Sequence, residues 1–535
     1  MRVHKPIGLL CTAAAVVVLA GCGGSSGSNG NGGGSGSGSG TQGSVPKDTG
    51  GQPKRGGTLT IARIEDSQSF DKTSVFQNES IWLVEQICES LYTVGKDGKT
   101  LKPWLATSYT KSGDGLTYTF KLKQGIKFSN GQDMTSADVK FSIDDARNAK
   151  KGWGYLDAAI KKITTPDPQT VVFHLKYRWA PFVADIALFA NGIIPKNFGG
   201  ESRAAFYKHP VGTGPFMWDS RVVGKSVTFK RNPNYWQKGK PYLDKVSWTY
   251  VSEDNTRELQ LRGNQIQVDE FPPFNSITKL QNTPDVKMGL FPSTRTDYLE
   301  MNENYAPLKD VHVRRAILSS IDYAAVVKSV LFGHGQPANS FLPPQVPFYD
   351  KNTPGLKFDI AKAKQELAQS KYPHGFKVEM LVGSGAQTEN QIAQIMQQAL
   401  KPLGIDITLK TEDTATEFQD VQNLKYQLGF SYWTMDIADP DELVEFAIDP
   451  KGGGAHSFFT DYSNPKLVTL SHQAEHNEDP AQRQKLYSQI QSIAANDAFL
   501  GPLYYSPFRY AYRSNLHGFY VYPLGNYHLE DVWIG

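Results

Sequence analysis

The sequence predicts a mixed α/β protein that is built from several lobes. Its length of 535 residues exceeds what one hydrophobic core normally organises, which favours two or three lobes. Helix and strand patterns alternate clearly only after about residue 300, whereas the middle of the chain is richer in hairpin-like strands. This distribution predicts one α/β lobe in the C-terminal half of the chain.

The first elements along the chain are strands, together with one well-marked helix. Thr58–Ala62 begins the folded part as a strand, and Thr117–Leu122 alternates polar and apolar residues with period two. Ser136–Arg147 has the pattern of a helix, and we expect Ser136 to be its N-cap. Val171–Leu175 alternates approximately and is predicted to be another strand.

Beyond residue 300, segments with apolar residues at helical spacing alternate with short strand-like runs. Helices are expected at Val311–Val330, Asp359–Ser370, Gln391–Leu403 and Pro480–Ala495. Strands are expected at Lys377–Val382, Asp406–Lys410 and Gln427–Ser431. The alternation is what predicts the C-terminal α/β lobe.

The N-terminus has the pattern of an exported lipoprotein. Arg2 and Lys5 precede an apolar run from Ile7 to Ala20, and small residues then precede Cys22. Because the run is shorter than the ~20 residues of a membrane-spanning helix, we predict a signal peptide over residues 1–21. Its end, Leu-Ala-Gly-Cys, resembles a bacterial lipobox, which predicts lipidation of Cys22 and retention on the extracytoplasmic face of the membrane. The alternative is an ordinary signal peptide in which Cys22 has no role.

Residues 22–56 are predicted to form a flexible tether that follows the lipidated cysteine. Gly, Ser and Asn dominate its first part, and such a segment cannot bury enough apolar surface to fold. As a flexible coil it should span roughly 30–35 Å. Of the three cysteines, Cys11 leaves with the signal peptide and Cys22 carries the lipid, so Cys88 has no internal disulfide partner. Helical spacing around Cys88 predicts a small buried side chain, and the lack of disulfides favours a Gram-positive cell surface.

Composition and motifs argue against several other classes of function. The formal net charge of +3 gives no reason to expect nucleic acid as a partner. A G-x-S-x-G match at Gly23–Gly27 lies in the tether, and Asp219 replaces the first glycine of a phosphate-binding loop that would end at Gly224–Ser226. His472 and His476 share a helical face but lie in a polar segment, which predicts a solvated face rather than a metal site. We therefore expect a monomer with no enzymatic activity, no metal and no cofactor, and a secreted hydrolase is the alternative from another class.

Short motifs follow one another in order from Gly56 to the C-terminus. They are Leu116–Phe128 with Asn130-Gly131 and Ser136–Ser142, Pro210–Phe216, Lys230–Trp236 with Pro241–Val246, Asp310–Ala316 with Ile321-Asp322, Trp433–Asp441, and Pro523–Gly525. In this order and spacing they resemble the family 5 extracellular solute-binding proteins of ABC importers, which include dipeptide- and oligopeptide-binding proteins. The resemblance implies a periplasmic-binding-protein-like fold, in which two α/β lobes clasp the ligand and an additional lobe accompanies them.

The resemblance also implies lobes that are assembled from separated stretches of the chain. Lobe I would combine residues 57–90, 209–294 and 505–535, lobe II would be residues 91–208, and lobe III residues 295–504. The ligand would be enclosed between lobes I and III by hinge closure. The implied function is a receptor that captures peptides and delivers them to the permease subunits of an importer. An oligosaccharide or another non-peptide solute is the alternative ligand.

Asp436 is the residue that the resemblance marks most clearly. Peptide binders of the family place an Asp three residues after a Trp, where it pairs with the α-amino group of the ligand, and Asp436 stands in this position after Trp433. Such a charge-assisted hydrogen bond contributes about 1.5–3 kcal/mol. Tyr432 directly precedes Trp433 and Thr434 directly follows it, and both are expected to contact the ligand. The flat ring of Trp433 would also contact the ligand. The structural alternatives are that Asp436 caps a turn and that Trp433 packs in the core.

Two further loops are expected to meet the ligand. Glu65, Asp66 and Ser67 lie in the first loop of lobe I, where ligands of the family touch that lobe; the alternative is a plain loop. Ser384 and Gly385 follow a predicted strand of lobe III. Dipeptide binders of the family carry an Arg in this second loop that grips the ligand carboxylate, and this chain has none there. The departure favours a longer peptide or a non-peptide solute.

Overall fold

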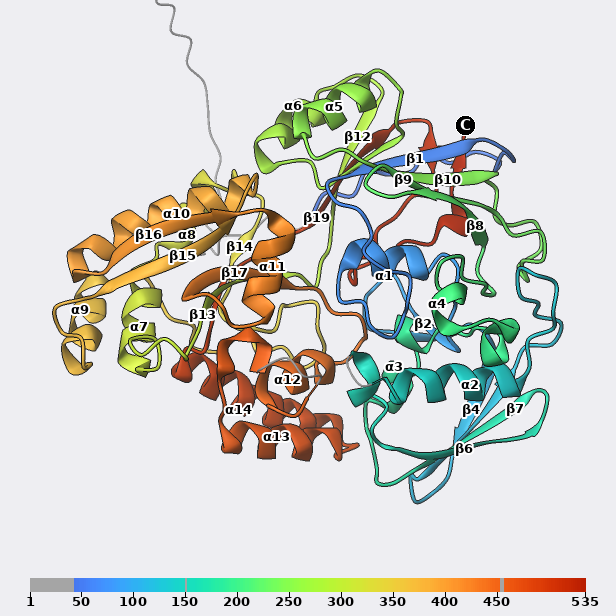
Figure 1. Cartoon of the computed structure of the whole chain (residues 1–535), viewed down its shortest axis with the longest axis horizontal. Coiled ribbons are helices and arrows are strands. Elements are labelled where there is room, and N and C mark those ends of the chain that lie inside the picture. The colour runs from blue at the N-terminus through green and yellow to red at the C-terminus, as the bar shows by residue number, and fades with distance from the viewer. Residues whose placement is uncertain (1–42, 150–151, 453–456) are drawn as a thin grey trace, which may run out of the picture. The chain divides into compact units, whose positions relative to one another are not determined.

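The computed structural model describes residues 43–149, 152–452 and 457–535. These residues form an α/β fold whose strands assemble into sheets of seven, six and four strands, with two additional two-stranded ribbons (Figure 1). The predicted signal peptide, Cys22 and most of the predicted tether lie outside the described residues. Within the described part, no helix has the length and apolar character needed to cross a membrane.

The seven-stranded sheet takes its strands from three separated stretches of the chain. In spatial order they are β12 (Val286–Phe291), β19 (Phe508–Arg513), β11 (Val268–Glu270), β1 (Thr58–Arg63), β10 (Lys245–Tyr250), β9 (Ser226–Arg231) and β8 (Phe216–Val222). The strand predicted at the start of the fold is β1, which runs parallel to both of its neighbours in the sheet. These stretches fall within the segments assigned to lobe I, and the lobe boundaries themselves stay a prediction.

The six-stranded sheet is drawn from the C-terminal half of the chain. In spatial order its strands are β14 (Gln336–Pro337), β18 (Leu500–Tyr505), β13 (Thr296–Met301), β17 (Leu428–Trp433), β15 (Lys377–Gly383) and β16 (Asp406–Glu412). The predicted strands of this half correspond to β15, β16 and β17, each one or two residues longer than expected at its C-terminal end. The parallel pairing of β15 with β16, with α10 packed on both strands, is the α/β arrangement that the alternation of helices and strands predicts.

The remaining strands form a four-stranded antiparallel sheet and the two ribbons. The four-stranded sheet has the order β4 (Ala106–Lys111), β5 (Thr117–Leu122), β7 (Thr170–Leu175) and β6 (Ile160–Asp167). The ribbons pair β2 (Tyr92–Val94) with β3 (Leu101–Pro103), and β20 (Leu516–His517) with β21 (Trp533–Ile534).

The helices are distributed among the three main sheets. They are α1 (Asn78–Val84), α2 (Ser136–Arg147), α3 (Phe182–Asp185), α4 (Arg203–Phe206), α5 (Asp254–Arg262), α6 (Ile277–Gln281), α7 (Val311–Ser319), α8 (Tyr323–Ser329), α9 (Ile360–Gln369), α10 (Gln387–Leu400), α11 (Thr414–Gln422), α12 (Asp441–Ile448), α13 (Pro465–Glu475) and α14 (Pro480–Asp497). Figure 1 shows α5 and α6 beside the seven-stranded sheet, and α2 beside the four-stranded sheet.

Two predicted helices need correction. The helix α2 has the predicted bounds, but its N-cap is Thr135 rather than Ser136. The Asp138 carboxylate accepts the backbone N–H of Thr135 at 2.8 Å, and the Thr135 side chain accepts the backbone N–H of Asp138, so the two residues form a capping box one residue earlier than expected. The single helix predicted over Val311–Val330 is two helices, α7 and α8. The Asp322 side chain accepts from the backbone N–H of Ala325 at 2.9 Å and so begins a new helix after a break.

Residues 43–56 contain no helix or strand but are attached to the fold at several points. The backbone N–H of Leu290 in β12 donates to the Ser44 carbonyl at 3.1 Å. The Asp48 carboxylate lies 2.8 Å from the Nδ1 atom of His517 and accepts the backbone N–H of Gly518 at 2.7 Å. These hydrogen bonds to the ionised form outweigh partial burial and lower the pKa of Asp48 to about 2. This end of the predicted tether therefore lies against β12 and the C-terminal segment.

Two short segments connect the seven-stranded sheet with the six-stranded sheet in the described part of the chain. Residues 292–295 lead from β12 to β13, and residues 506–507 lead from β18 to β19. Because β12 pairs with β19 and β13 pairs with β18, the two connections lie side by side and run in opposite directions. The Ser506 hydroxyl donates to the Asp297 carboxylate at 3.0 Å and ties one connection to the start of β13.

The predicted burial of Cys88 is confirmed, since the residue is 3% exposed. Burial raises the pKa of its thiol to about 12, so the side chain stays in the unreactive thiol form near neutral pH. His472 and His476 are both exposed, as the polar character of their segment predicts.

Candidate functional site

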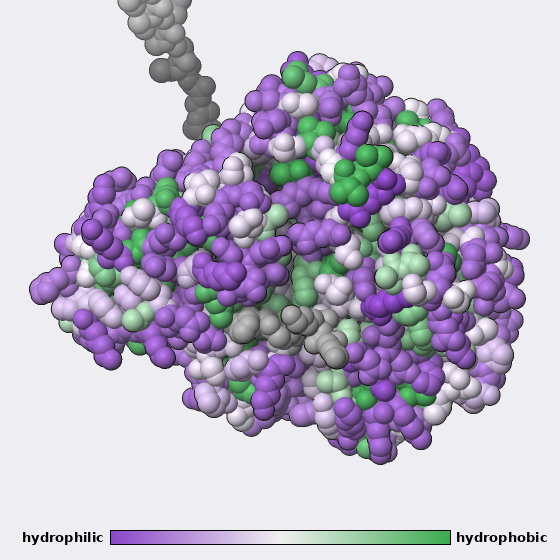
Figure 2. All heavy atoms as spheres, viewed as in Figure 1, coloured by the Kyte–Doolittle hydropathy of each residue, from purple (hydrophilic) through white to green (hydrophobic). Residues whose placement is uncertain are grey.

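The predicted site residues lie where strands of two sheets end. Glu65, Asp66 and Ser67 follow β1 of the seven-stranded sheet, whereas Ser384 and Asp436 follow β15 and β17 of the six-stranded sheet. Figure 1 shows α1 facing α11 and α12 across the space between these sheets, and Figure 2 shows the surface hollowed in the middle of the same view. We use the name recess for the region where side chains of the two sheets come together, and define it by Glu65, Asn78, Glu389, Glu417, Tyr432, Thr434 and Asp436.

A hydrogen bond joins the two sides of the recess in the described structure. The side-chain amide of Asn78 in α1 lies 3.5 Å from the hydroxyl of Thr434, and both residues are buried. Thr434 was expected among the ligand contacts, and the structure places it at this junction between the sheets.

The loop that carries Asp436 is held by one buried carboxylate. Glu442, near the start of α12, accepts the backbone N–H groups of Asp436 at 2.8 Å and Ile437 at 2.9 Å with the same oxygen. Its other oxygen accepts the indole N–H of Trp433 at 3.0 Å. Three donors thus meet one carboxylate, which fixes the backbone on both sides of Asp436. Sequence reasoning missed Glu442, although Asp-Pro-Asp-Glu after the loop is a signal for a helix start that could have drawn attention to it.

The Asp436 carboxyl lies among other acidic groups. Burial and the neighbouring carboxylates of Glu442 and Glu85 raise its pKa well above the ordinary value for Asp. Glu85 belongs to the segment after α1, so acidic groups from both sides of the recess act on Asp436. A positively charged group beside Asp436 would stabilise its ionised form and remove this mutual repulsion.

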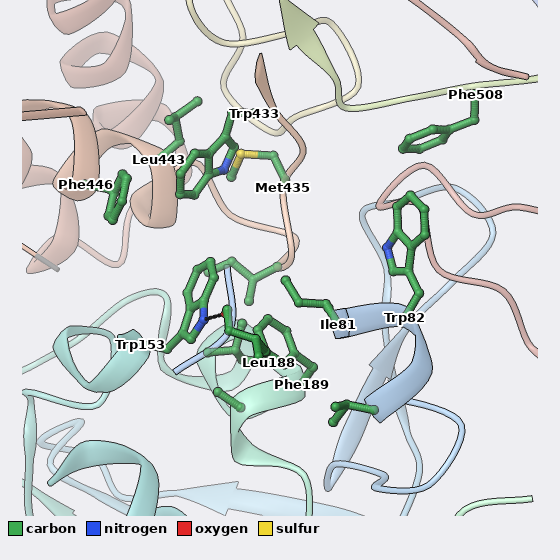
Figure 3. Packing of buried hydrophobic residues seen from close by; sticks show 14 of the residues in the cluster. Ile81, Trp82, Trp153, Leu188, Phe189, Trp433, Met435, Leu443, Phe446 and Phe508 are labelled. Carbon is green, nitrogen blue, oxygen red and sulfur yellow. Dashed lines mark hydrogen bonds between the residues drawn. The ribbon is translucent and has the colours of Figure 1, made fainter. Parts of the chain in front are cut away.

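Trp433 and its neighbour Tyr432 have different surroundings. Trp433 is 8% exposed, and its ring centroid lies 4.6 Å from that of Phe446 and 6.2 Å from that of Trp153. Figure 3 shows Trp433 against Leu443 and Phe446, with Trp153 facing them from a separate segment of the chain. Most of the Trp433 ring therefore packs in the core, which is the structural alternative to a ligand contact. Tyr432 is 36% exposed, and the guanidinium of Arg295 lies 3.7 Å from its ring centroid.

In the first predicted loop, Ser67 and Asp66 make structural contacts, whereas Glu65 lies among other acidic side chains. Ser67 is fully buried and donates to the Glu79 carbonyl at 2.9 Å, and Asp66 forms an ion pair with Arg221 at 3.2 Å. Glu65 has a different environment, because burial and the carboxylates of Glu79 and Glu389 raise its pKa to about 7. Glu65 is therefore the residue of this loop whose ionised form a cationic ligand group would stabilise most.

Two acidic residues of the recess escaped the sequence analysis. Glu389 lies in α10 and Glu417 in α11, and they come near Glu65 only because the two sheets face each other. Burial raises the pKa of Glu389 to about 7. Burial, and after it the negative charges of Glu389 and Glu65, raise the pKa of Glu417 to about 8. No sequence spacing links residues in three separate elements, so these contacts become visible only in the folded chain.

The second predicted loop is open to solvent. Ser384 and Gly385 are exposed, and Gly385 adopts a φ of +84°, a conformation that favours glycine. The charge of Arg295 partly offsets the burial that raises the pKa of Glu389, but Arg295 is already paired with Asp297 at 2.6 Å. The acidic groups of the recess thus outnumber the cations that the described residues bring to it.

A separate cavity of about 60 Å³ lies next to the segment after α1. Its lining includes Glu85, Glu89, Asn526 and His528. One oxygen of Glu85 and the side-chain oxygen of Asn526 are buried without a hydrogen-bond partner among the described residues. Unpaired polar atoms around a small polar cavity are typical of ordered water, so we interpret it as a water site rather than as the ligand site.

Comparison with known proteins gives matches over most of the chain. Residues 100–454 match the sequence profile described as "Bacterial extracellular solute-binding proteins, family 5 Middle". The glutathione-binding protein GsiB of Escherichia coli (strain K12) is 30% identical over 458 residues, which cover 83% of this chain and 88% of GsiB.

Solved structures with a similar fold cover even more of the chain. DppA, an ABC transporter-associated periplasmic binding protein from Helicobacter pylori in complex with the peptide STSA, superimposes with a TM-score of 0.81 at 26% identity, over 90% of this chain and 98% of DppA. AgaA of A. tumefaciens R10 in complex with agropinic acid gives a TM-score of 0.81 at 25% identity, over 90% of this chain and 99% of AgaA.

Proposed function

Because the chain belongs to the bacterial extracellular solute-binding proteins of family 5, we propose that it captures peptides between its two larger lobes and delivers them to an ABC permease. Its fold is periplasmic-binding-protein-like, and proteins of this family bind peptides or other small solutes for ABC importers. In our proposal the ligand is bound and released without chemical change.

The observation that carries the peptide proposal is the position of Asp436. It stands on a loop that Glu442 clamps, and acidic groups from both sides of the recess surround it. A peptide α-ammonium supplies the positive charge that this arrangement lacks. GsiB is named for binding glutathione and DppA was solved with a tetrapeptide, and both names agree with the proposal.

A second cluster of acidic side chains in the recess favours a ligand with an additional positive charge. Glu65, Glu389 and Glu417 have raised pKa values of about 7, 7 and 8, so they are partly protonated near neutral pH. A basic peptide side chain in this part of the recess would favour their ionised forms. Binding of such a ligand should therefore release protons.

A non-peptide solute is the alternative ligand. The exposed ring of Tyr432 offers a face on which a sugar ring can stack, and AgaA was solved with agropinic acid rather than with a peptide. A neutral oligosaccharide would leave the acidic groups of the recess without a cationic partner. We therefore keep the peptide proposal as the main one.

We expect that the bound ligand, identified by native mass spectrometry of freshly purified protein, carries at least one positive charge. When that ligand is titrated in by calorimetry, its affinity should rise from pH 5.5 to pH 7.0, because the raised carboxyl pKa values mean that protons compete with it below neutrality. Titrations in two buffers of different ionisation enthalpy measure the proton release directly.

The same titrations distinguish a peptide ligand from a neutral saccharide and from a substrate that the protein hydrolyses. The matched control is Asp406→Asn, which removes an exposed carboxylate at the end of β16 that pairs with the start of β15, opposite the end from which the site loop leaves, and it should leave both affinity and proton release unchanged. A neutral saccharide that binds with no proton release would overturn the peptide proposal. Recovery of a ligand in chemically altered form after incubation would instead favour the hydrolase.

We further propose that the protein is a monomer held on the extracytoplasmic face of the membrane by a lipid on Cys22, at a Gram-positive cell surface. Two or more acyl chains hold a protein stably at a membrane, whereas one gives only reversible binding. Replacing Cys22 by Ala should move the protein from the membrane fraction to the soluble fraction or stall its processing. Membrane fractionation and processing like those of the wild type would show that the anchor is elsewhere.

A further inference from the structure

Three carboxylates converge at a place away from the recess. Asp441 and Glu445 are one helical turn apart on α12, so they project from the same face of that helix. Glu475 is the last residue of α13, which packs against α12. One carboxylate oxygen from each of the three residues lies within 4.8 Å of one from each of the others.

The basic side chains near these carboxylates are paired with other acidic residues. Asp441 is 0% exposed and Glu475 is 2% exposed, and no basic side chain of the described residues forms a salt bridge with any of the three. The two candidate cations nearby are already used, since His472 lies 3.3 Å from Asp449 and Arg483 forms two hydrogen bonds with Asp439. Buried like charges that lack a partner are strongly destabilising unless protons or a metal ion neutralise them.

Buried carboxylate oxygens without a hydrogen-bond partner are a second, independent indication of a ligand site. Neither carboxylate oxygen of Asp441 has a hydrogen-bond partner in the described structure, and one oxygen of Glu445 is also buried and unpaired. Glu475 accepts the Ser471 hydroxyl at 2.9 Å, and it can share a hydrogen bond with Asp441 only while one of the two carboxyls keeps its proton.

A fourth buried carboxylate, from a different part of the chain, acts electrostatically on the cluster. Asp185, the last residue of α3, is fully buried, and its Oδ2 atom accepts the indole N–H of Trp179 at 2.6 Å. Its other oxygen has no partner among the described residues. The charge of Asp185 acts on both Asp441 and Glu445 and adds to the negative charge at the three carboxylates. Because α3 is remote from α12 and α13 in sequence, the convergence is a property of the fold.

We infer that Asp441, Glu445 and Glu475, supported by Asp185, form a binding site for a calcium ion. Carboxylate oxygens are the ligands that hard divalent cations prefer. Calcium accepts several protein carboxylates in a flexible geometry, whereas magnesium keeps several of its waters and usually binds through only one or two carboxylates. The partial exposure of Glu445 provides an access route for the ion.

The site would join the part of the chain that carries α3 to the part that carries α12. The same helix α12 supplies Glu442, which holds the loop of Asp436. Calcium would therefore stabilise the support of the recess without touching the ligand. Nothing in this inference depends on the ligand being a peptide.

The test uses the whole mature chain after removal of metals with a chelator. We expect equilibrium dialysis to show one calcium ion bound per chain, and 1 mM calcium to raise the unfolding temperature by about 2 to 4 °C. Magnesium at the same concentration should have a smaller effect. The variants Asp441→Asn and Glu475→Gln should lose calcium binding and the temperature response.

Both variants remain informative if they fold differently from the wild type. Each removes a buried negative charge, so the calcium-free variants should be at least as stable as the calcium-free wild type. The matched control is Glu478→Gln, which removes a partly exposed carboxylate paired with Lys111 and should keep the full calcium response. Calcium binding that persists in Asp441→Asn and Glu475→Gln would overturn the assignment. A wild type that binds no calcium would show that protons alone neutralise the cluster.

Discussion

Replacing Asp436 by Asn is expected to weaken ligand binding by about 10- to 100-fold, which corresponds to roughly 1.5–3 kcal/mol. The substitution keeps the shape of the side chain and removes its charge, so it removes the charge-assisted hydrogen bond to a ligand ammonium. The loop itself should keep its conformation, because Glu442 binds the backbone N–H groups of residues 436 and 437, which the substitution leaves in place. Calorimetric titration of the wild type and the variant measures the loss.

Acetylation of the ligand amino group tests whether Asp436 is its partner. It removes the other half of the same pair, and a pair that has already lost one member cannot lose the same interaction again. The losses from Asp436→Asn and from acetylation should therefore not add in a double-mutant cycle. Fully additive losses would mean that the amino group binds elsewhere, and no effect of acetylation would favour a sugar ligand.

Replacing Trp433 by Ala is expected to reduce the free energy of unfolding by about 3–5 kcal/mol. The ring fills a buried space among Phe446, Phe458 and Trp153, and its removal leaves a cavity there. It also removes one of the three donors to the buried carboxylate of Glu442. Denaturation with urea, followed by circular dichroism, measures the change.

The neighbouring residue supplies a matched control. Tyr432→Ala removes a ring of similar size that is 36% exposed and contacts Arg295, so we expect a loss of stability of about 1 kcal/mol or less. If Trp433 were mainly a ligand contact, the two variants would instead unfold alike, and Trp433→Ala would weaken binding without lowering stability.

Local patterns predicted most of the elements, and their errors have identifiable causes. Periodicity located β5 and α2 correctly, because alternation and helical spacing depend on residues close in sequence. The same periodicity continued across residues 320–322 and concealed the break between α7 and α8. The N-cap of α2 was displaced by one residue because Thr135 and Ser136 are both good caps, and the partner Asp138 decides between them.

The candidate site was predictable only where one loop carries its own motif. Asp436 and Trp433 are three residues apart, so the resemblance could mark them together. Glu389 and Glu417 lie in different helices, and their approach to Glu65 depends on how two sheets face each other. The packing of Trp433 depends in the same way on Trp153, which a remote segment supplies. Contacts of this kind are set by tertiary structure, which no spacing in the sequence records.

The two connections between the larger sheets, residues 292–295 and 506–507, restrict how those sheets can move. Two short segments that lie side by side permit rotation about a common axis, but they resist sliding of one sheet past the other. In the closing movement that we propose, the same loops would return to the same partners, and Asn78 would meet Thr434 again after each release. The course of the backbone would then make the proposed closure reproducible without a permanent link across the recess.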